Sequence, residues 1–203
     1  MTFRFAKALF FYLISLSVAL AAVTEHDGVM SYLNSIRSFQ AEFKQYDTDG
    51  KVRSGKLYIL KPGKIRWEYL LPNTILIIGK GDNIVYYDQE LEEVTYTSSK
   101  SSLAHFLTKP DIDFSKEMAV EQYLKGKDYS ELTISDKKSS QETNISKIGL
   151  KFKNTPPQLV QLDVTDLNGN TSEILFSAIK INKQIDSQMF VFKNPKFFNK
   201  NRG

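Results

Sequence analysis

The chain of 203 residues contains no cysteine and only two histidines. The lack of cysteine excludes a disulfide framework, thiol catalysis and cysteine-ligated metals. His26 and His105 lie on separate predicted helices, and neither has the second histidine four positions away that a zinc-protease helix requires. The residue types that most often carry enzyme chemistry are therefore scarce or poorly placed.

Other catalytic motifs are also missing. The sequence has no Gly-x-Ser-x-Gly elbow, and none of its five Gly-Lys pairs is followed by the Ser or Thr of a phosphate-binding loop. Asp111 with Asp113, and Glu90 with Glu92 and Glu93, are expected on solvated faces, since no pattern places these carboxylates in a cleft. We therefore expect a protein that is not an enzyme and that binds no cofactor or metal.

Long apolar runs are limited to the N-terminus. Arg4 and Lys7 precede the apolar residues 8–16, and Ala19-Leu20-Ala21 supplies the small residues of a cleavage site, an arrangement typical of a secretory signal peptide. An uncleaved membrane anchor is the alternative, although the run is short for a span of about 20 residues. We predict a signal peptide over residues 1–21 and a single domain over residues 22–203.

The remaining composition is that of an ordinary globular protein. Removing residues 1–21 leaves 25 basic and 23 acidic residues, so the charge is nearly balanced and a nucleic-acid partner is not expected. Aromatic residues are plentiful, with 14 Phe and 10 Tyr, and the apolar fraction is 41%. This length and composition allow one domain with a substantial core.

Apolar periodicity predicts a mainly β fold with a few helices. A capping-box pattern at 24–27 and helical spacing predict a first helix over residues 25–36, and a second short helix is expected within residues 99–108. Residues 117–124 favour a strand, with a helix as the alternative. Alternation and turn residues predict the other strands at 39–45, 52–60, 64–69, 74–78, 84–88, 92–97, 129–135, 145–153, 158–165, 171–181 and 189–192. Such an order indicates a curved antiparallel meander whose mouth the helices cover.

The hairpin from Gly55 to Tyr69 is the most informative stretch. Pro62-Gly63 predicts a tight turn, with glycine supplying the positive φ of a type II turn. After it, Ile65, Trp67 and Tyr69 alternate with charged residues and share one dry face. Two interpretations remain open: these side chains line a cavity for an apolar ligand, or they form a solid core. The solid core would consist of Trp67, Tyr69, Tyr87, Tyr96 and Phe176, packed against the helices.

Four ordered stretches resemble the LolA family of periplasmic outer-membrane lipoprotein carriers. They are Phe39-x-Ala41-x-Phe43-x-Gln45, then Gly55 to Tyr69 with Pro72, then Ile84 to Asp88 with Glu90-Leu91 and Val94, and finally Asp166, Gly169-Asn170, Phe176 and Asp186 to Phe192. Together these stretches span nearly the whole chain after the predicted signal peptide. The resemblance implies an incomplete β-barrel lidded by helices, with an apolar cavity that holds the acyl chains of a lipoprotein.

The resemblance also implies partners and site residues. A monomeric periplasmic carrier of this kind is loaded by an inner-membrane ABC transporter complex and delivers lipoproteins to the outer membrane, often through a lipoprotein receptor there. An arginine that locks the lid is usual before the hairpin proline, and Lys61 occupies that position here. We expect the cavity to be lined by Leu33, Ile36, Phe43, Leu57, Ile59, Ile65, Trp67, Tyr69, Leu103, Phe106 and Leu107.

Two further functions remain open from the sequence. A periplasmic sensor or adaptor domain of the same fold would bind a protein, and a general lipid-binding protein would take free fatty acids or glycolipids. The short basic tail after Phe192 departs from the family pattern, so the sequence leaves its role and the outer-membrane receptor open.

Overall fold

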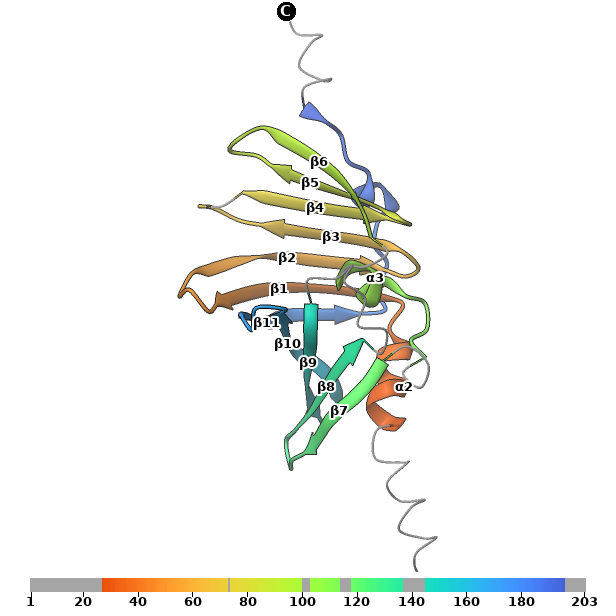
Figure 1. Cartoon of the computed structure of the whole chain (residues 1–203). Coiled ribbons are helices and arrows are strands. Elements are labelled where there is room, and N and C mark those ends of the chain that lie inside the picture. The colour runs from red at the N-terminus through yellow and green to blue at the C-terminus, as the bar shows by residue number, and fades with distance from the viewer. Residues whose placement is uncertain (1–26, 73, 100–102, 114–117, 137–144, 196–203) are drawn as a thin grey trace, which may run out of the picture.

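The computed structural model describes residues 27–72, 74–99, 103–113, 118–136 and 145–195, which form one long antiparallel sheet with short helices near one end (Figure 1). The strand order is β6-β5-β4-β3-β2-β1-β11-β10-β9-β8-β7. The strands are β1 (Ser38–Asp47), β2 (Val52–Leu60), β3 (Lys64–Tyr69), β4 (Ile75–Lys80), β5 (Asn83–Asp88), β6 (Glu93–Ser98), β7 (Met118–Lys125), β8 (Tyr129–Asp136), β9 (Ile145–Asn154), β10 (Pro157–Asp166) and β11 (Thr171–Ile181). Because β6 and β7 are free edges, the sheet does not close.

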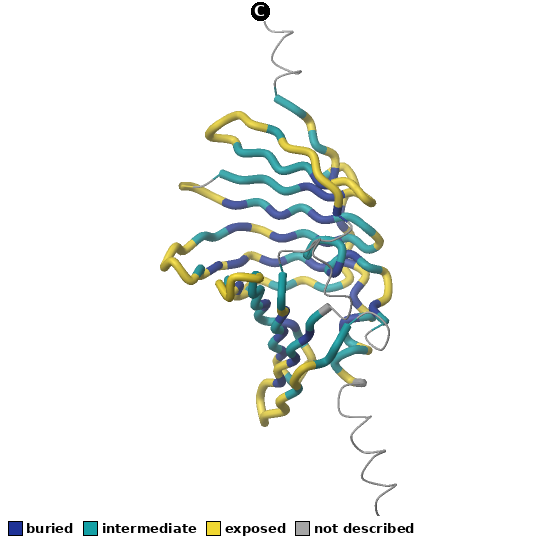
Figure 2. Tube along the Cα trace, in the orientation of Figure 1, coloured by how far each residue is buried: buried dark blue, intermediate teal, exposed yellow. Residues whose placement is uncertain are grey.

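The sheet is curved and has one dry face. Figure 1 shows it bending beyond β11, so that β7–β9 run across the direction of β1–β6. Along β3 the burial alternates strictly, and Trp67 lies opposite Leu57 on β2 and Ile77 on β4. The same alternation is visible as dark blue positions along the central strands in Figure 2. The predicted class, a mainly β fold with an incomplete barrel of one antiparallel sheet, is confirmed.

Two short helices cover the concave side. The helices are α2 (Asp27–Ser35) and α3 (Leu103–Thr108). Tyr32 of α2 accepts a hydrogen bond on its hydroxyl from the Leu159 N–H at 3.0 Å. The Asn34 amide exchanges two hydrogen bonds with the backbone of Ile112, beyond α3. In the described ranges, no helix is both long and apolar enough to cross a membrane.

Glycine is required at two places in the central hairpin. A Cβ on Gly55 would lie 2.0 Å from the Glu68 carbonyl oxygen and 2.6 Å from the Phe43 ring, so only glycine fits between β3 and Phe43. Gly63 has the expected positive φ of 71°, although the Lys61–Pro62 peptide is cis. The Gly63 N–H donates to the Thr108 carbonyl at 3.0 Å, which ties the hairpin turn to the end of α3.

The sequence located the elements well, with one clear error. Residues 118–125 are a strand, as favoured, and the remaining predicted strands lie within a few residues of the observed ones. The strand predicted at 189–192 is wrong, because Ser187–Phe190 form a 3₁₀ helix, η1. Asp186 caps it by accepting the Gln188 N–H, and the buried Phe190 packs on the outer face of the sheet, where no strand edge is available for pairing. The predicted signal peptide and residues 24–26 of the capping-box pattern lie outside the described residues.

Candidate functional site

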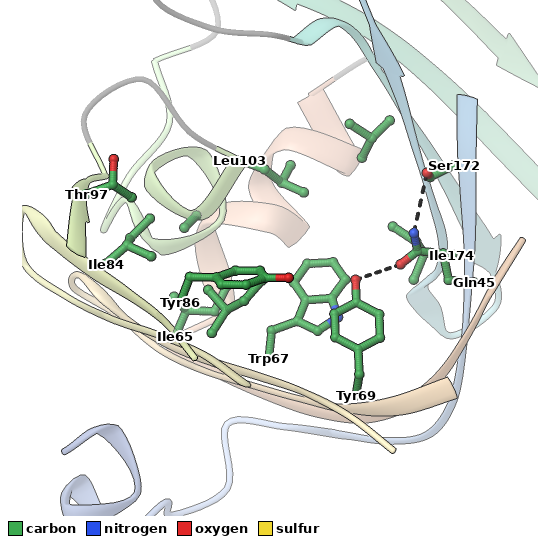
Figure 3. Close-up of a pocket in the computed structure, with 13 residues that line it drawn as sticks. Gln45, Ile65, Trp67, Tyr69, Ile84, Tyr86, Thr97, Leu103, Ser172 and Ile174 are labelled. Atoms are coloured by element: carbon green, nitrogen blue, oxygen red, sulfur yellow. Dashed lines mark hydrogen bonds between the residues drawn. The ribbon is translucent and has the colours of Figure 1, made fainter. Parts of the chain in front are cut away.

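A cavity of about 340 Å³ lies on the concave face of the sheet, and we call it the large cavity (Figure 3). Its walls come from strands on both sides of the bend and from α3. The lining residues are Gln45, Ile65, Trp67, Tyr69, Ile77, Ile84, Tyr86, Thr97, Leu103, Ala104, Val164, Ser172 and Ile174. Ligand pockets of proteins typically measure about 300–1,000 Å³ and are mostly apolar, so this one is large enough for a small hydrophobic ligand.

Aromatic side chains form the floor of the large cavity. The Trp67 and Tyr69 rings are stacked, with centroids 6.3 Å apart, because alternation along β3 places both on the concave face. Phe43 supports them edge-on, at 5.4 Å from Trp67 and 5.2 Å from Tyr69. The indole Nε1 of Trp67 is buried and has no hydrogen-bond partner within the described part of the chain. The floor is therefore a closely packed and strongly apolar surface.

A polar corner closes one side of the large cavity. The Tyr69 hydroxyl donates to Gln45 Oε1 at 2.8 Å, and Gln45 Nε2 donates to Asp47 Oδ1 at 2.7 Å. The Ser172 hydroxyl donates to the same Asp47 oxygen at 2.6 Å, while the Arg53 guanidinium pairs with the other oxygen at 2.5 Å. These four contacts join β1, β2, β3 and β11, so the corner fixes the shape of the cavity.

The electrostatics of this corner follow from its burial. Desolvation raises the pKa of Tyr69 to about 12, with Arg53 opposing the rise and Asp47 adding to it. Burial also acts to raise the pKa of Asp47, but hydrogen bonds from Ser172, Gln45 and Arg53, together with the charge of Arg53, outweigh it and lower that pKa. At neutral pH the corner thus holds a neutral tyrosine and an ionised carboxylate.

A second space, between the helices and β1–β2, is nearly filled, and we call it the small gap. Its volume is only about 40 Å³. Six of the predicted site residues line it, together with Lys61. These six are Leu33, Ile36, Leu57, Ile59, Phe106 and Leu107. Helix α3 separates the two spaces, since Leu103 and Ala104 face the large cavity and Phe106 and Leu107 face the small gap.

Lys61 connects the hairpin turn to the first helix. Its Nζ donates to the Leu33 carbonyl at 3.2 Å, in the last turn of α2, where the same carbonyl also accepts the Ile36 N–H at 3.4 Å. Burial lowers the pKa of Lys61, the charge of Arg37 lowers it further, and Asp111 raises it in part. Arg37 itself donates to the Pro110 carbonyl at 2.8 Å. This cluster holds α2 and the segment after α3 over the small gap.

The predicted site residues thus divide between two places. Ile65, Trp67, Tyr69 and Leu103 line the large cavity. Phe43 lines neither space, because its ring packs behind Trp67 and Tyr69 and against Gly55. The solid-core interpretation also fails for two of its members. The Tyr87 ring lies tilted against Phe192 on the outer face, with centroids 5.5 Å apart, and Tyr96 is 67% exposed.

Sequence reasoning missed nine of the residues that line the large cavity. They are Gln45, Ile77, Ile84, Tyr86, Thr97, Ala104, Val164, Ser172 and Ile174. The strand register would have found several of them, since Ile77 lies opposite Trp67 and Tyr86 lies opposite Ile77. Val164 lies on β10 and Ser172 and Ile174 lie on β11, on the far side of β1 from β3, and no local pattern places them near β3.

Comparison with known proteins agrees with this geometry. The sequence model of the family described as "Outer membrane lipoprotein carrier protein LolA" matches residues 34–193. An outer-membrane lipoprotein carrier protein from Chromobacterium violaceum is 32% identical over 191 residues, covering 90% of this chain and 91% of that protein. An uncharacterized protein from Rickettsia prowazekii is 29% identical over 168 residues, covering 83% and 76%.

Solved structures share the fold at much lower identity. A protein of the DUF1329 family from Desulfovibrio piger superposes with a TM-score of 0.50 and 16% identity, covering 80% of this chain and 92% of that one. This likeness speaks for the architecture alone. The sequence matches go further, because the family match spans most of the chain. The chain therefore belongs to the LolA family of outer-membrane lipoprotein carrier proteins.

Proposed function

We propose that this protein carries lipoproteins across the periplasm and holds their acyl chains in the large cavity. The observation that carries the proposal is an apolar space of about 340 Å³, walled by Ile65, Trp67, Ile77 and Leu103 and left unfilled by the side chains of the described residues. An adaptor that only recognises another protein would need no such space. The family membership and the predicted signal peptide support export to the periplasm.

The energetics explain why such a carrier is needed. Each buried methylene contributes about 0.8 kcal/mol, so one acyl chain of roughly fourteen carbons represents on the order of 11 kcal/mol. Unassisted transfer of a lipoprotein from a membrane into water would therefore be very slow. The cavity lowers this barrier by offering apolar walls in place of water.

The position of α3 suggests how more than one chain is accommodated. Because this helix separates the large cavity from the small gap, displacing it would join the two spaces and expose Leu57, Ile59 and Phe106 to cargo. The hairpin turn resists that displacement, because the Gly63 N–H binds the Thr108 carbonyl at the end of α3 and Lys61 anchors the same turn to α2. In this proposal Lys61 controls the lid, and cargo binding provides the energy that moves it.

The proposed partners follow from the same scheme. An inner-membrane ABC complex loads the protein and supplies the energy of release, since the sequence offers no nucleotide site of its own. The loaded monomer then delivers the lipoprotein to the outer membrane, directly or through a lipoprotein receptor. The chain makes and breaks no covalent bond in this cycle.

The test is release of lipoproteins from spheroplasts. The protein lacking residues 1–21 is expected to bring lipoproteins into the supernatant, and Ala104→Phe is expected to reduce this release because it fills the large cavity from α3. The matched control is Ala119→Phe on the edge strand β7, which lines neither the large cavity nor the small gap. Release no greater than with buffer, or equal release by both variants, would contradict the proposal.

A further inference from the structure

Tyr86 places a hydroxyl group inside the large cavity, where none of the described residues hydrogen-bonds to it. The residue lies on β5, opposite Ile77, so the pleat directs its ring to the concave face. Figure 3 shows the ring lying along the cavity floor with its hydroxyl end toward Trp67. Within the described part of the chain, no residue hydrogen-bonds to this hydroxyl, although Tyr86 lines the cavity.

The polar corner across the cavity behaves differently. The Tyr69 hydroxyl is committed to Gln45 Oε1, and the Ser172 hydroxyl is committed to Asp47. Gln45 Nε2 already donates to Asp47 at 2.7 Å. The hydroxyl and amide donors of Tyr69, Ser172 and Gln45 are therefore already paired within the corner, whereas the donor of Tyr86 has no partner among the described residues.

A free hydroxyl in an apolar cavity makes the cavity selective. Water can hydrate Tyr86 until a ligand enters, but a bound hydrocarbon chain displaces this water and leaves the donor unpaired, which is unfavourable. A ligand that carries a carbonyl group at the right depth replaces the lost hydrogen bond. The free energy of binding thus favours a chain with a hydrogen-bond acceptor near one end over a plain alkane.

We propose that the Tyr86 hydroxyl donates a hydrogen bond to the carbonyl oxygen at the head of a bound acyl chain. The large cavity then recognises acyl esters and amides. The hydrogen bond at the head of the chain fixes how far the chain extends into the cavity. This inference rests on the proposed carrier function and adds a specificity-determining residue to it.

The protonation of Tyr86 suits this role. Burial raises the pKa of its hydroxyl, the nearby charge of Asp88 raises it further, and Arg53 lowers it in part. The group therefore remains protonated, and able to donate, throughout the neutral range.

The neighbouring residue offers a matched control. Tyr87 also lies on β5, but it points to the outer face and contacts Phe192. Tyr86→Phe and Tyr87→Phe each remove one hydroxyl and keep the ring. Only the first removes a donor from the cavity.

The experiment measures the binding of methyl octanoate and of decane, which have chains of equal length with and without a carbonyl. Trp67 is the only tryptophan of the chain and lines the cavity, so its fluorescence reports binding in the protein lacking residues 1–21. We expect Tyr86→Phe to weaken the ester by roughly 3- to 10-fold relative to the alkane, as for the loss of one hydrogen bond. Comparing the variant with the wild-type protein for each ligand separately cancels the different solubilities of the two ligands in water.

A second measurement observes the hydrogen bond by infrared spectroscopy. The carbonyl stretch of bound, ¹³C-labelled methyl octanoate is expected to fall in frequency in the wild-type protein and to return toward the free value in Tyr86→Phe. If both ligands bind but Tyr86→Phe and Tyr87→Phe affect them alike, with no shift of the band, the inference is overturned while the carrier function stands. If neither ligand binds the wild-type protein, the carrier proposal fails and this inference fails with it.

Discussion

The large cavity and the small gap are built from the same kinds of side chain on the same concave face, yet one holds about 340 Å³ and the other about 40 Å³. The difference arises from the helices. Around Leu57 and Ile59 both helices press onto the sheet, whereas around Trp67 and Ile77 only the first turn of α3 reaches the wall. Capacity for cargo is thus governed by where the helices lie, and apolar composition alone does not create it.

The largest expected effect is a difference in stability between matched isoleucines. Ile59→Ala in the small gap is expected to lower the free energy of unfolding by about 2–5 kcal/mol, because it leaves a new void in a packed region. Ile77→Ala on the wall of the large cavity should cost only about 1–2 kcal/mol, since that side chain lacks packing on one side already. Urea unfolding measures both values. Equal losses would show that the two regions are packed alike.

The second prediction concerns stability at alkaline pH, where Tyr69 in the polar corner of the large cavity loses its proton. The pKa of Tyr69 is about 12 in the folded protein and about 10 when unfolded, so the unfolded chain loses this proton first. The stabilisation is present below pH 10 and is lost as the pH rises through about 12. We expect the wild-type free energy of unfolding to fall by up to about 1.4 kcal/mol per pH unit more steeply than that of Tyr69→Phe in this range.

Stability measurements from pH 8 to 12 on the two proteins check this prediction. The difference between the two proteins isolates the contribution of Tyr69 from those of the lysines and the other tyrosines that titrate in the same range. Parallel curves would mean that Tyr69 is as solvated in the folded protein as in the unfolded chain.

The smallest expected effect on stability concerns Lys61. Lys61→Leu removes the hydrogen bond to the Leu33 carbonyl, so we expect a loss of about 1 kcal/mol and a helix α2 that is less firmly held. We also expect the amount of lipoprotein loaded or released to change, although a stability loss of this size leaves the protein folded. Amide hydrogen exchange of α2 and the spheroplast assay measure the two effects. Unchanged exchange and unchanged transfer would remove Lys61 from lid control.

Much of the fold could be predicted because β periodicity is local. The alternation of Ile65, Trp67 and Tyr69 identified both the strand and its dry face, and the pattern around Pro62-Gly63 located the turn. The region around Phe190 was misjudged because a short apolar run does not distinguish a strand from a single helical turn.

The candidate site was harder to predict because its lining residues are brought together by contacts between strands that lie far apart in the sequence. Gln45 and Ser172 are 127 residues apart and meet only because β1 pairs with β11. Leu57 and Trp67 look equivalent in sequence, but α3 packs over Leu57 and leaves space over Trp67. Tyr86 and Tyr87 are identical neighbours, and only the register of β5 decides which one faces the cavity.

The most direct test asks whether an acyl chain enters the large cavity and not the small gap. An acyl chain carrying bromine atoms quenches tryptophan fluorescence only at short range, and Trp67 is the single tryptophan, on the floor of the large cavity. We expect saturable quenching of Trp67 as a brominated acyl ester is added, with protection by an unlabelled ester. Binding of the brominated ester with no quenching of Trp67 would contradict the proposed site.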